Sequence, residues 1–433
     1  MRLWWINGTT RFVEMPEDKT GEALILTKDD VLLRLRCRSV SGRSGEGRMH
    51  SDADEFLLWL QNHRRVSWQG ALAGYRTGVH VVNESRIAIT RTFRLIEPEA
   101  GEWPAIRRWI ESALDDADTP QLPYLLAWLR CAYESLRDGV FRPGYLFFLI
   151  GPSDAGKSVF QDQICKPLLG GRSANPLPHL RDRDNFNDDV GAAEFQSVQE
   201  LKGCKTDFKS RQELGEGLKE LTVNLEMRIR APYASAFMAP VWRRVAISLN
   251  DHPDKLKLAP ALAGDFRDKL LMLKFKRAEL SDTGTGDTWL EFGQTIRREL
   301  PAFLHWLLND WEIPAALLEG PHVGRFGHAG YIHPEIENEL FDMTVDSIVL
   351  AAIDAAGIFT SDDAGKPQPW GWGKSEDLRE ILLQGSFSAD LTKHLERTNA
   401  TGEYLAKLEH QHPKRFKKRR DGKKGKFWMI YPR

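Results

Sequence analysis

The stretch Tyr145-Leu-Phe-Phe-Leu-Ile-Gly151-Pro-Ser-Asp-Ala-Gly156-Lys157-Ser158 decides the fold. Its apolar first half predicts a buried strand, and its second half matches G-x-x-x-x-G-K-[ST], with helix-compatible residues after it. In such a loop the backbone N–H groups and the helix N-terminus attract phosphate, the lysine reaches the outer phosphates, and the hydroxyl can ligate magnesium. The loop predicts a nucleoside triphosphate site made of Gly151, Pro152, Ser153, Asp154, Ala155, Gly156, Lys157 and Ser158. The alternative is a structural glycine-rich turn.

The regions on either side of this loop suggest several domains. Apolar residues recur at helical spacing from Trp103 to Leu136, and strand-like and helix-like stretches then alternate, as in an α/β layer. We therefore predict an α/β fold built on this P-loop, with a parallel sheet flanked by helices. The predicted domains are a mixed α+β accessory region (1–100), a helical segment (101–140), the ATPase core (141–286), a helical region (287–342) and a C-terminal domain (343–433).

Two later stretches are candidates for completing a nucleotide site. Ala193 to Glu200 reads as a modest strand that ends at an acid able to hold magnesium and orient water. A surface helix carrying Glu194 and Glu200 is the alternative. Val241 to Leu249 reads as a strand ending in Asn250, which either senses the terminal phosphate or is a turn residue.

The ordered set of these motifs resembles the superfamily 3 helicases of the AAA+ class, closest to phage and mobile-element primase-helicases. The stretches that carry the resemblance are Gly151 to Ser158, Gln199 to Gly203, Leu218 to Glu226 and Val245 to Asn250. The resemblance implies ATP and Mg²⁺ as cofactors. It implies Walker A roles for Lys157 and Ser158, with Ser158 on the metal, a Walker B role for Glu200, and a sensor role for Asn250. Gln199 departs from the family, which has an acid there, and this puts the rate of hydrolysis in doubt.

The same resemblance implies a hexameric ring in which each subunit completes its neighbour's site. Arg267 stands where the family places its arginine finger; a solvated charge is the alternative. Family members also carry a DNA-gripping hairpin after Glu226. The corresponding stretch, Met227 to Phe237, offers Arg228, Arg230 and Tyr233 for contacts with phosphates and bases.

Charge is distributed unevenly along the chain. The totals are 60 Lys plus Arg and 61 Asp plus Glu. Residues 401–433 hold eleven of the basic and three of the acidic residues, a charge of +8, so the remainder, with 49 basic and 58 acidic residues, carries −9. The near-zero net charge therefore results from two segments of opposite charge, and the basic C-terminal end could still bind nucleic acid.

The C-terminal end reads as a winged helix. Helices are predicted over 344–355, 375–383, 388–397 and 401–410, a loop over 366–373, and a hairpin around Asp421-Gly422. The helix 401–410 would enter the major groove of duplex DNA, and the hairpin would contact phosphates. The candidate contacts are Lys407, Lys414, Arg415, Lys417, Lys418, Arg419, Arg420, Lys423 and Lys424. A solvated basic tail is the alternative, but the apolar run Phe427 to Tyr431 argues against it.

Composition narrows the class of protein further. At 42% hydrophobic and 28% charged residues the chain can bury a core. The four cysteines lack zinc or disulfide spacing, and no stretch is long enough to span a bilayer, so we expect a protein of the bacterial host cytoplasm with no membrane partner.

The preferred function is an ATP-dependent replicative DNA helicase of a phage or mobile element. One alternative is an ATP-binding DNA initiator or regulator with weak or no hydrolysis; a small-molecule kinase ranks below it. Residues 1–95 show no primase site. Either a separate primase acts with this chain or the chain is a helicase-only relative.

Overall fold

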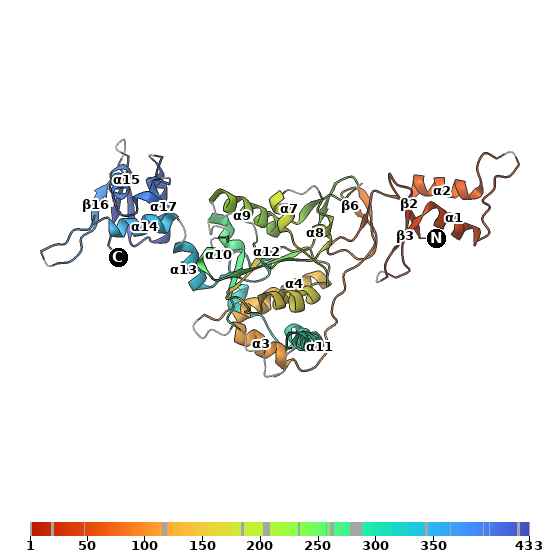
Figure 1. Cartoon of the computed structure of the whole chain (residues 1–433), viewed down its shortest axis with the longest axis horizontal. Helices are drawn as coiled ribbons and strands as arrows, with labels where there is room; N and C mark the ends of the chain where they lie inside the picture. The colour runs from red at the N-terminus through yellow and green to blue at the C-terminus, as the bar shows by residue number, and fades with distance from the viewer. Residues whose placement is uncertain are drawn as a thin grey trace. The chain divides into compact units, whose positions relative to one another are not determined.

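The computed structural model describes residues 2–18, 21–46, 48–114, 119–182, 186–201, 208–232, 234–256, 258–259, 264–277, 288–342, 345–363, 365–392, 394–397, 399–421 and 425–432. The chain divides into two compact units, Met1–His333 and Pro334–Arg433 (Figure 1). Each unit has its own hydrophobic core and is described separately.

A parallel sheet of six strands organises the first unit. The spatial order is β15-β14-β8-β13-β10-β9, and every pair in it is parallel. The strands are β8 (Leu146–Gly151), β9 (Ser173–Ala174), β10 (Phe195–Val198), β13 (Arg244–Asn250), β14 (Leu270–Lys274) and β15 (Tyr331–Ile332). β8 is buried along its whole length, which explains its unbroken apolar sequence. The predicted α/β fold with a parallel sheet flanked by helices is confirmed.

Helices cover both faces of this sheet. Figure 1 shows α3, α4 and α11 grouped on one side and α7 and α9 on the other. The longer helices are α3 (Pro104–Leu114), α4 (Leu122–Arg137), α9 (Phe208–Val223) and α11 (Thr288–Asn309). The shorter ones are α5 (Lys157–Val159), the π-helix η1 (Phe160–Cys165), α6 (Lys166–Leu168), α7 (Leu177–Asp182), α8 (Asp188–Ala192), α10 (Pro253–Leu256), the 3₁₀ helices η2 (Gly264–Lys269) and η3 (Ala315–Leu318), and α12 (Val323–Phe326).

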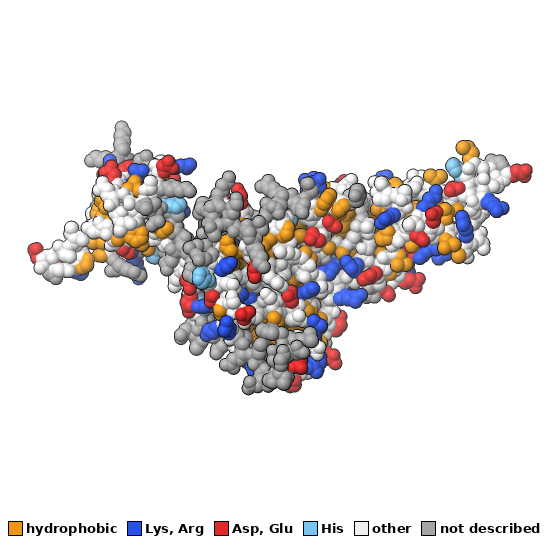
Figure 2. Space-filling model, viewed as in Figure 1, with side chains coloured by type: hydrophobic (Ala, Val, Ile, Leu, Met, Phe, Trp, Pro, Cys, Tyr) orange, Lys and Arg blue, Asp and Glu red, His pale blue; other side chains and the backbone are white. Residues whose placement is uncertain are grey.

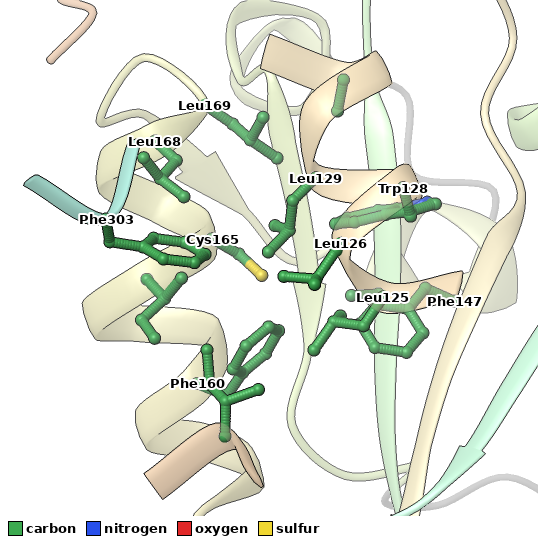
Figure 3. Close-up of a cluster of buried hydrophobic side chains, with 14 of the residues drawn as sticks. Leu125, Leu126, Trp128, Leu129, Phe147, Phe160, Cys165, Leu168, Leu169 and Phe303 are labelled. Carbon is green, nitrogen blue, oxygen red and sulfur yellow. The ribbon is translucent and has the colours of Figure 1, made fainter. Parts of the chain in front are cut away.

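The largest apolar cluster fixes the helix that follows the phosphate loop. Figure 3 shows Leu125, Leu126 and Leu129 of α4 pointing toward Phe160, Cys165 and Leu168 across the core, with Phe303 of α11 closing one end. All of these side chains are buried. This buried cluster, which also includes Phe147 of β8, packs the helix that begins at Lys157 against the sheet.

The N-terminal part of the first unit contains two small sheets and two helices. One sheet has the order β3-β2-β1-β4 and the other β5-β7-β6. The elements are β1 (Leu3–Ile6), β2 (Arg11–Glu14), β3 (Leu24–Thr27), α1 (Lys28–Arg36), α2 (Asp52–His63), β4 (Arg65–Val66), β5 (Trp68–Gly70), β6 (Gly78–Val82) and β7 (Ser85–Ile89). A hairpin joins β6 to β7 through Asn83-Glu84, with φ of 44° and 66° at its two turn residues.

A buried ion pair joins this N-terminal part to the edge of the main sheet. The Glu194 carboxylate, fully buried, pairs with the Arg172 guanidinium and accepts a hydrogen bond from the Gly74 N–H at 2.9 Å. Burial raises the pKa of Glu194, and the arginine opposes this rise. Glu194 therefore has a structural role, and the alternative of a surface helix carrying it is wrong, because β10 begins at the next residue.

The second unit contains a helical cluster and a three-stranded sheet of order β16-β18-β17. Its elements are α13 (Pro334–Asp342), α14 (Val345–Ala355), β16 (Trp370–Gly373), α15 (Ser375–Gln384), α16 (Ser388–Leu391), α17 (Ala400–Gln411), β17 (Phe416–Asp421) and β18 (Gly425–Ile430).

Two predictions for this unit need correction. The predicted loop 366–373 includes the strand β16, because Trp370 pairs with Ile430 of β18, a contact distant in sequence. The predicted helix 388–397 ends at Leu391, and residues 394–397 are not helical. Leu395 is nevertheless buried in the core of the unit, which explains its apolar spacing with Leu391.

Among the described residues, no helix is long and apolar enough to cross a membrane.

Candidate functional site

The glycines of the phosphate loop are required by its geometry. Gly156 has φ of +80°, a left-handed conformation that other residues adopt at a cost, and a Cβ there would lie 2.9 Å from the Trp109 ring. A Cβ at Gly151 would collide with the Phe275 carbonyl oxygen on the neighbouring strand end. The loop is therefore pressed between α3 and β14, with no room for side chains at these two positions.

Lys157 begins the helix and is directed back into the loop. Its ammonium donates hydrogen bonds to the carbonyl oxygens of Gly151 at 2.7 Å and Pro152 at 2.6 Å. Burial lowers the pKa of Lys157, while the Asp251 and Asp154 carboxylates favour its charged form. An anion placed at the loop would further stabilise this partly desolvated ammonium.

Asn250 lies where the sequence predicts, at the end of β13 and directly beside the loop. β13 is the immediate neighbour of β8, with Asn250 level with Gly151. The Asn250 side-chain amide donates to the Ser153 hydroxyl at 3.3 Å, and the Asp251 N–H donates to the Gly151 carbonyl at 3.2 Å. This end of the strand therefore contacts the phosphate loop through both a side chain and the backbone.

The predicted strand before Glu200 is confirmed as β10, and its polar residues have buried partners. Gln161 of the π-helix contacts the Ser197 hydroxyl and donates to the Ser248 hydroxyl of β13 at 2.9 Å. Gln196 donates to the Val190 carbonyl at 3.3 Å. These hydrogen bonds lower the cost of burying polar side chains in the strand, although the Gln196 Oε1 is buried without a hydrogen-bond partner. β13 lies between β8 and β10, so Glu200 belongs to the second strand from the loop.

A cleft of about 580 Å³ opens beside the phosphate loop. It is lined by Ser158, Asp162, Ser173, Ala174, Asn175, Leu177, Pro178, Ser197, Gln199 and Glu200. Ser158 and Glu200 are both exposed to solvent and line the same cleft, so the structure brings these two predicted metal ligands to one place.

Asp162 is a further acid in this cleft that the sequence analysis missed. Its carboxylate accepts a hydrogen bond from the Gln199 side-chain amide at 2.8 Å. Asp162 follows Ser158 by four residues, a spacing that places both on one side of a helix. A carboxylate thus lies beside the position where the family resemblance requires an acid and this chain has Gln199. The signal that could have revealed it is the Ser158/Asp162 spacing in the loop's own helix.

These residues fit a magnesium ion bound with a nucleotide. Ser158, Asp162 and Glu200 offer hydroxyl and carboxylate oxygens, the ligands that Mg²⁺ prefers. Within the described residues, no group of three or more His, Cys, Asp or Glu side chains is arranged to hold a metal alone. Mg²⁺ commonly takes one or two carboxylates and completes its shell with phosphates and waters, which suits this set.

Arg267 lies at the opposite end of the sheet from the phosphate loop. It is exposed in η2, directly before β14, and the first residue of β14 is level with Leu146 of β8. Gly151 lies five residues further along β8, and at about 3.3 Å per residue the two ends are roughly 16 Å apart. Arg267 therefore cannot reach the loop of its own subunit.

The stretch after Glu226 forms a two-stranded antiparallel hairpin, β11 (Glu226–Ile229) and β12 (Phe237–Pro240). Arg228 and Arg230 are exposed, while Tyr233 lies outside the described residues. Asn187 fixes the outgoing strand through hydrogen bonds with the Arg228 carbonyl and the Arg230 N–H, both at 2.8 Å. The Asn83 side chain of the N-terminal hairpin donates to the Met238 carbonyl at 3.1 Å.

The basic residues of the C-terminal unit differ in their surroundings. The Arg415 guanidinium pairs with the Asp354 carboxylate and donates to the Tyr431 carbonyl at 3.0 Å. Lys407 is exposed on α17, with its ammonium 3.7 Å from Asp346. Exposed side chains at the end of the unit are Lys414, Lys417, Lys418, Arg419 and Arg420, while Lys423 and Lys424 lie outside the described residues.

Charges elsewhere on the chain are mixed in sign. Figure 2 shows Lys and Arg side chains interspersed with Asp and Glu over the visible face of the N-terminal part. Such a surface has no large field of one sign on that face.

The fold is shared with solved structures of low sequence identity. "The apo structure of NrS-1 C terminal region (305-718)" matches with a TM-score of 0.54 and 12% identity, covering 99% of this chain and 95% of that chain. "The A form apo structure of NrS-1 C terminal region-CTR" gives 0.53 and 10%, covering 100% and 96%. "SCCmec type IV Cch - active helicase" gives 0.34 and 12%, covering 88% and 85%, a score too low to bear on the fold. No family model and no curated protein sequence matches. Over nearly its whole length, the chain is therefore similar in fold to the NrS-1 C-terminal region.

Proposed function

We propose that this protein is an ATP-dependent DNA helicase of superfamily 3, from a phage or mobile element. The observation that carries the proposal is the cleft lined both by Ser158, at the end of the phosphate loop, and by Glu200, two residues after β10. A turn that served only the fold would have no reason to place an acid and a loop hydroxyl in one solvent-filled cleft. The contact between Asn250 and Ser153 supports the same assignment.

Each residue has a role that follows from its place. The loop N–H groups and Lys157 bind the phosphates of ATP, and Ser158, Asp162 and Glu200 hold the magnesium ion. The ion neutralises charge that develops on the phosphate oxygens during transfer to water. Glu200 orients the attacking water, and Asn250 reports the terminal phosphate to the loop through Ser153.

The position of Arg267 supports hydrolysis between subunits of a ring. Roughly 16 Å separates it from its own loop, as the strand lengths require. An exposed arginine at the far end of the sheet suits insertion into the site of an adjacent copy, where it would stabilise charge on the phosphate. We propose a hexamer on the basis of the family resemblance.

Two parts of the chain suit DNA. The β11–β12 hairpin presents Arg228 and Arg230 to solvent, and in the proposed ring it faces the channel and grips one strand. The helices and the hairpin of the C-terminal unit support its assignment as a winged helix, whose basic residues would contact duplex phosphates.

The decisive experiment replaces Lys157 by alanine. We expect Lys157→Ala to abolish DNA-stimulated ATP hydrolysis and strand separation of a forked substrate, because the phosphate-binding charge is lost. The matched control is Lys166→Ala, a lysine near the end of the same helix and outside the cleft. Retention of DNA-stimulated hydrolysis in Lys157→Ala, with hydrolysis unchanged in the control, would falsify the motor assignment.

A second candidate is a DNA-binding initiator or regulator in which ATP only organises an oligomer. It is favoured by Gln199, which puts an amide where the family has an acid. This candidate predicts tight ATP binding and ring formation with negligible turnover, so single-turnover hydrolysis in the presence of forked DNA separates the two. Turnover that ignores DNA but responds to a metabolite would instead point to a small-molecule kinase.

A further inference from the structure

The sheet of the C-terminal unit has an outer face that differs from its core face. Along β18, Trp428 and Ile430 are buried in the core of the unit. Side chains alternate along a strand, so Phe427 and Met429 point to the other side. Across the ladder, Arg419 is paired with Phe427 and Lys417 with Met429, which places these two cations on the same outer face.

The pairing register of β16 with β18 shifts between Trp370 and Gly373, which interrupts the alternation, so Trp370 and Trp372 lie on opposite sides of this sheet. Trp370 packs against the buried core cluster. Trp372 is 37% exposed and belongs to the outer face, because the Arg419 guanidinium lies 4.8 Å from its ring centre. Tyr431 is on this face as well, with the Lys417 ammonium 5.0 Å from its ring centre. We call Trp372, Phe427, Met429 and Tyr431, together with Lys417 and Arg419, the outer wing face.

Rings and cations are therefore paired on this face. Each nucleotide of a single strand carries one base, which stacks on flat rings, and one phosphate, which seeks a cation. The face repeats this combination twice, as Trp372 with Arg419 and as Tyr431 with Lys417. β17 contains a single acidic residue, Asp421 at its end, so the net charge of the face is positive.

We propose that the outer wing face binds unpaired nucleotides of a nucleic-acid strand. Bases stack on Trp372 and Phe427, and phosphates bind Arg419 and Lys417. A duplex does not fit this role, because its bases are stacked on one another and expose only their edges and backbone. The inference goes beyond the proposed function, which assigns to this unit contacts with duplex phosphates.

The test measures the binding of three fluorescent probes to the full chain without nucleotide. The probes are a dT15 strand, an abasic strand of equal length and charge, and a hairpin duplex. The chain carries Arg228→Ala and Arg230→Ala, so that the β11–β12 hairpin contributes no arginine. Adding Trp372→Leu and Phe427→Leu should weaken dT15 binding at least about tenfold, because base stacking is lost, and should leave the other two affinities within about twofold.

Trp59→Leu is the matched control. Trp59 is 43% exposed in the first unit and also has an arginine, Arg64, 5.6 Å from its ring centre, so an unspecific effect of removing an exposed tryptophan would appear there. Unchanged dT15 binding in the double leucine variant overturns the proposal. An equal loss for all three probes, in variants whose thermal unfolding is unchanged, also overturns it, since that result marks a surface that binds phosphates alone. The assay contains no ATP, so its outcome is independent of the Lys157 experiment.

Discussion

The phosphate loop and the outer wing face are the two proposed phosphate-binding surfaces, and they are built in different ways. The loop uses backbone groups pressed between α3 and β14, where Gly151 and Gly156 leave no space for side chains. The wing face uses exposed side chains on a sheet, with cations supported by rings. A site made of packed backbone should fail completely on a small change, whereas a site made of exposed charges should weaken in steps. The four predictions below test this contrast.

The largest effect is expected for Gly156→Ala. The alanine residue must adopt a φ of +80°, and its methyl group would lie 2.9 Å from the Trp109 ring. Left-handed strain and overpacking together should cost about 2–4 kcal/mol of unfolding free energy. Because the loop must shift to relieve the contact, we expect hydrolysis to fall about a hundredfold. Chemical denaturation and steady-state hydrolysis measure the two effects.

Gly171→Ala is the control for that substitution. Gly171 has the same φ of +80°, but a Cβ there would meet nothing within 4 Å. It should cost about 1 kcal/mol and leave hydrolysis unchanged. Equal effects of the two substitutions on hydrolysis would show that the packing of the loop against Trp109 is unimportant.

The second effect is a loss of stability at low pH, which we expect because of a histidine buried in the first unit. His328 is buried against the Tyr145 ring, and its Nδ1–H donates to the Ala329 carbonyl at 2.8 Å. Burial, assisted by the charge of Arg244, lowers its pKa to about 4, from 6.5 when exposed. Between these two pKa values, His328 is protonated in the unfolded chain but neutral in the folded chain. Between pH 6.5 and 4 this should remove up to about 3 kcal/mol of stability from the first unit.

His328→Asn tests this directly, because an amide can donate the same hydrogen bond without titrating in this range. The loss of stability on acidification should shrink in this variant. His63→Asn, which removes an exposed histidine bonded to the Trp59 carbonyl, should keep the wild-type profile. Denaturation at several pH values measures both, and identical profiles in the two variants would contradict the assignment.

The third effect concerns the acid that faces Gln199. Asp162→Asn keeps the size of the side chain but removes its charge from the cleft beside Ser158 and Glu200. We expect the affinity for ATP in the presence of Mg²⁺ to fall about tenfold, with little change when EDTA replaces Mg²⁺. Binding of a fluorescent ATP analogue measures this. The control is Asp189→Asn, which replaces an exposed acid of α8. If Asp162→Asn and the wild type bind the analogue with equal affinity, both with Mg²⁺ and without it, then Asp162 is not part of the metal site.

Asp162 also shows what could be predicted from the sequence and what could not. The buried strand, the loop and the helix of the phosphate site are contiguous in the chain, so their order predicted the structure of β8 and the following helix. The pairing of Asp162 with Gln199 joins a helix to the end of a strand two positions away in the sheet, and periodicity within either segment carries no information about it.

The same physical reason explains the errors in the C-terminal unit. Trp370–Gly373 contains two glycines and looked like a loop, and it is a strand only because β18, distant in the sequence, pairs with it. The hairpin of β17 and β18 was predicted because its two strands are adjacent in the chain. The roles of Arg267 and of the ring remain predictions, because contacts between copies leave no periodic signal in one sequence.

The smallest effect separates two neighbouring basic residues of the wing. Lys414 is exposed, whereas Arg415 is bound to Asp354 and to the Tyr431 carbonyl. Lys414→Ala should weaken duplex binding about threefold and reduce the salt slope of log K by about 0.9, with the melting temperature unchanged. Arg415→Ala should instead lower the melting temperature of the C-terminal unit by about 5 °C, because Asp354 loses its partner, and should leave the salt slope unchanged. Fluorescence anisotropy over a range of salt concentrations, together with calorimetry, distinguishes the two outcomes. If Arg415→Ala reduces the slope as Lys414→Ala does, then its ion pair opens on DNA and the two residues act alike.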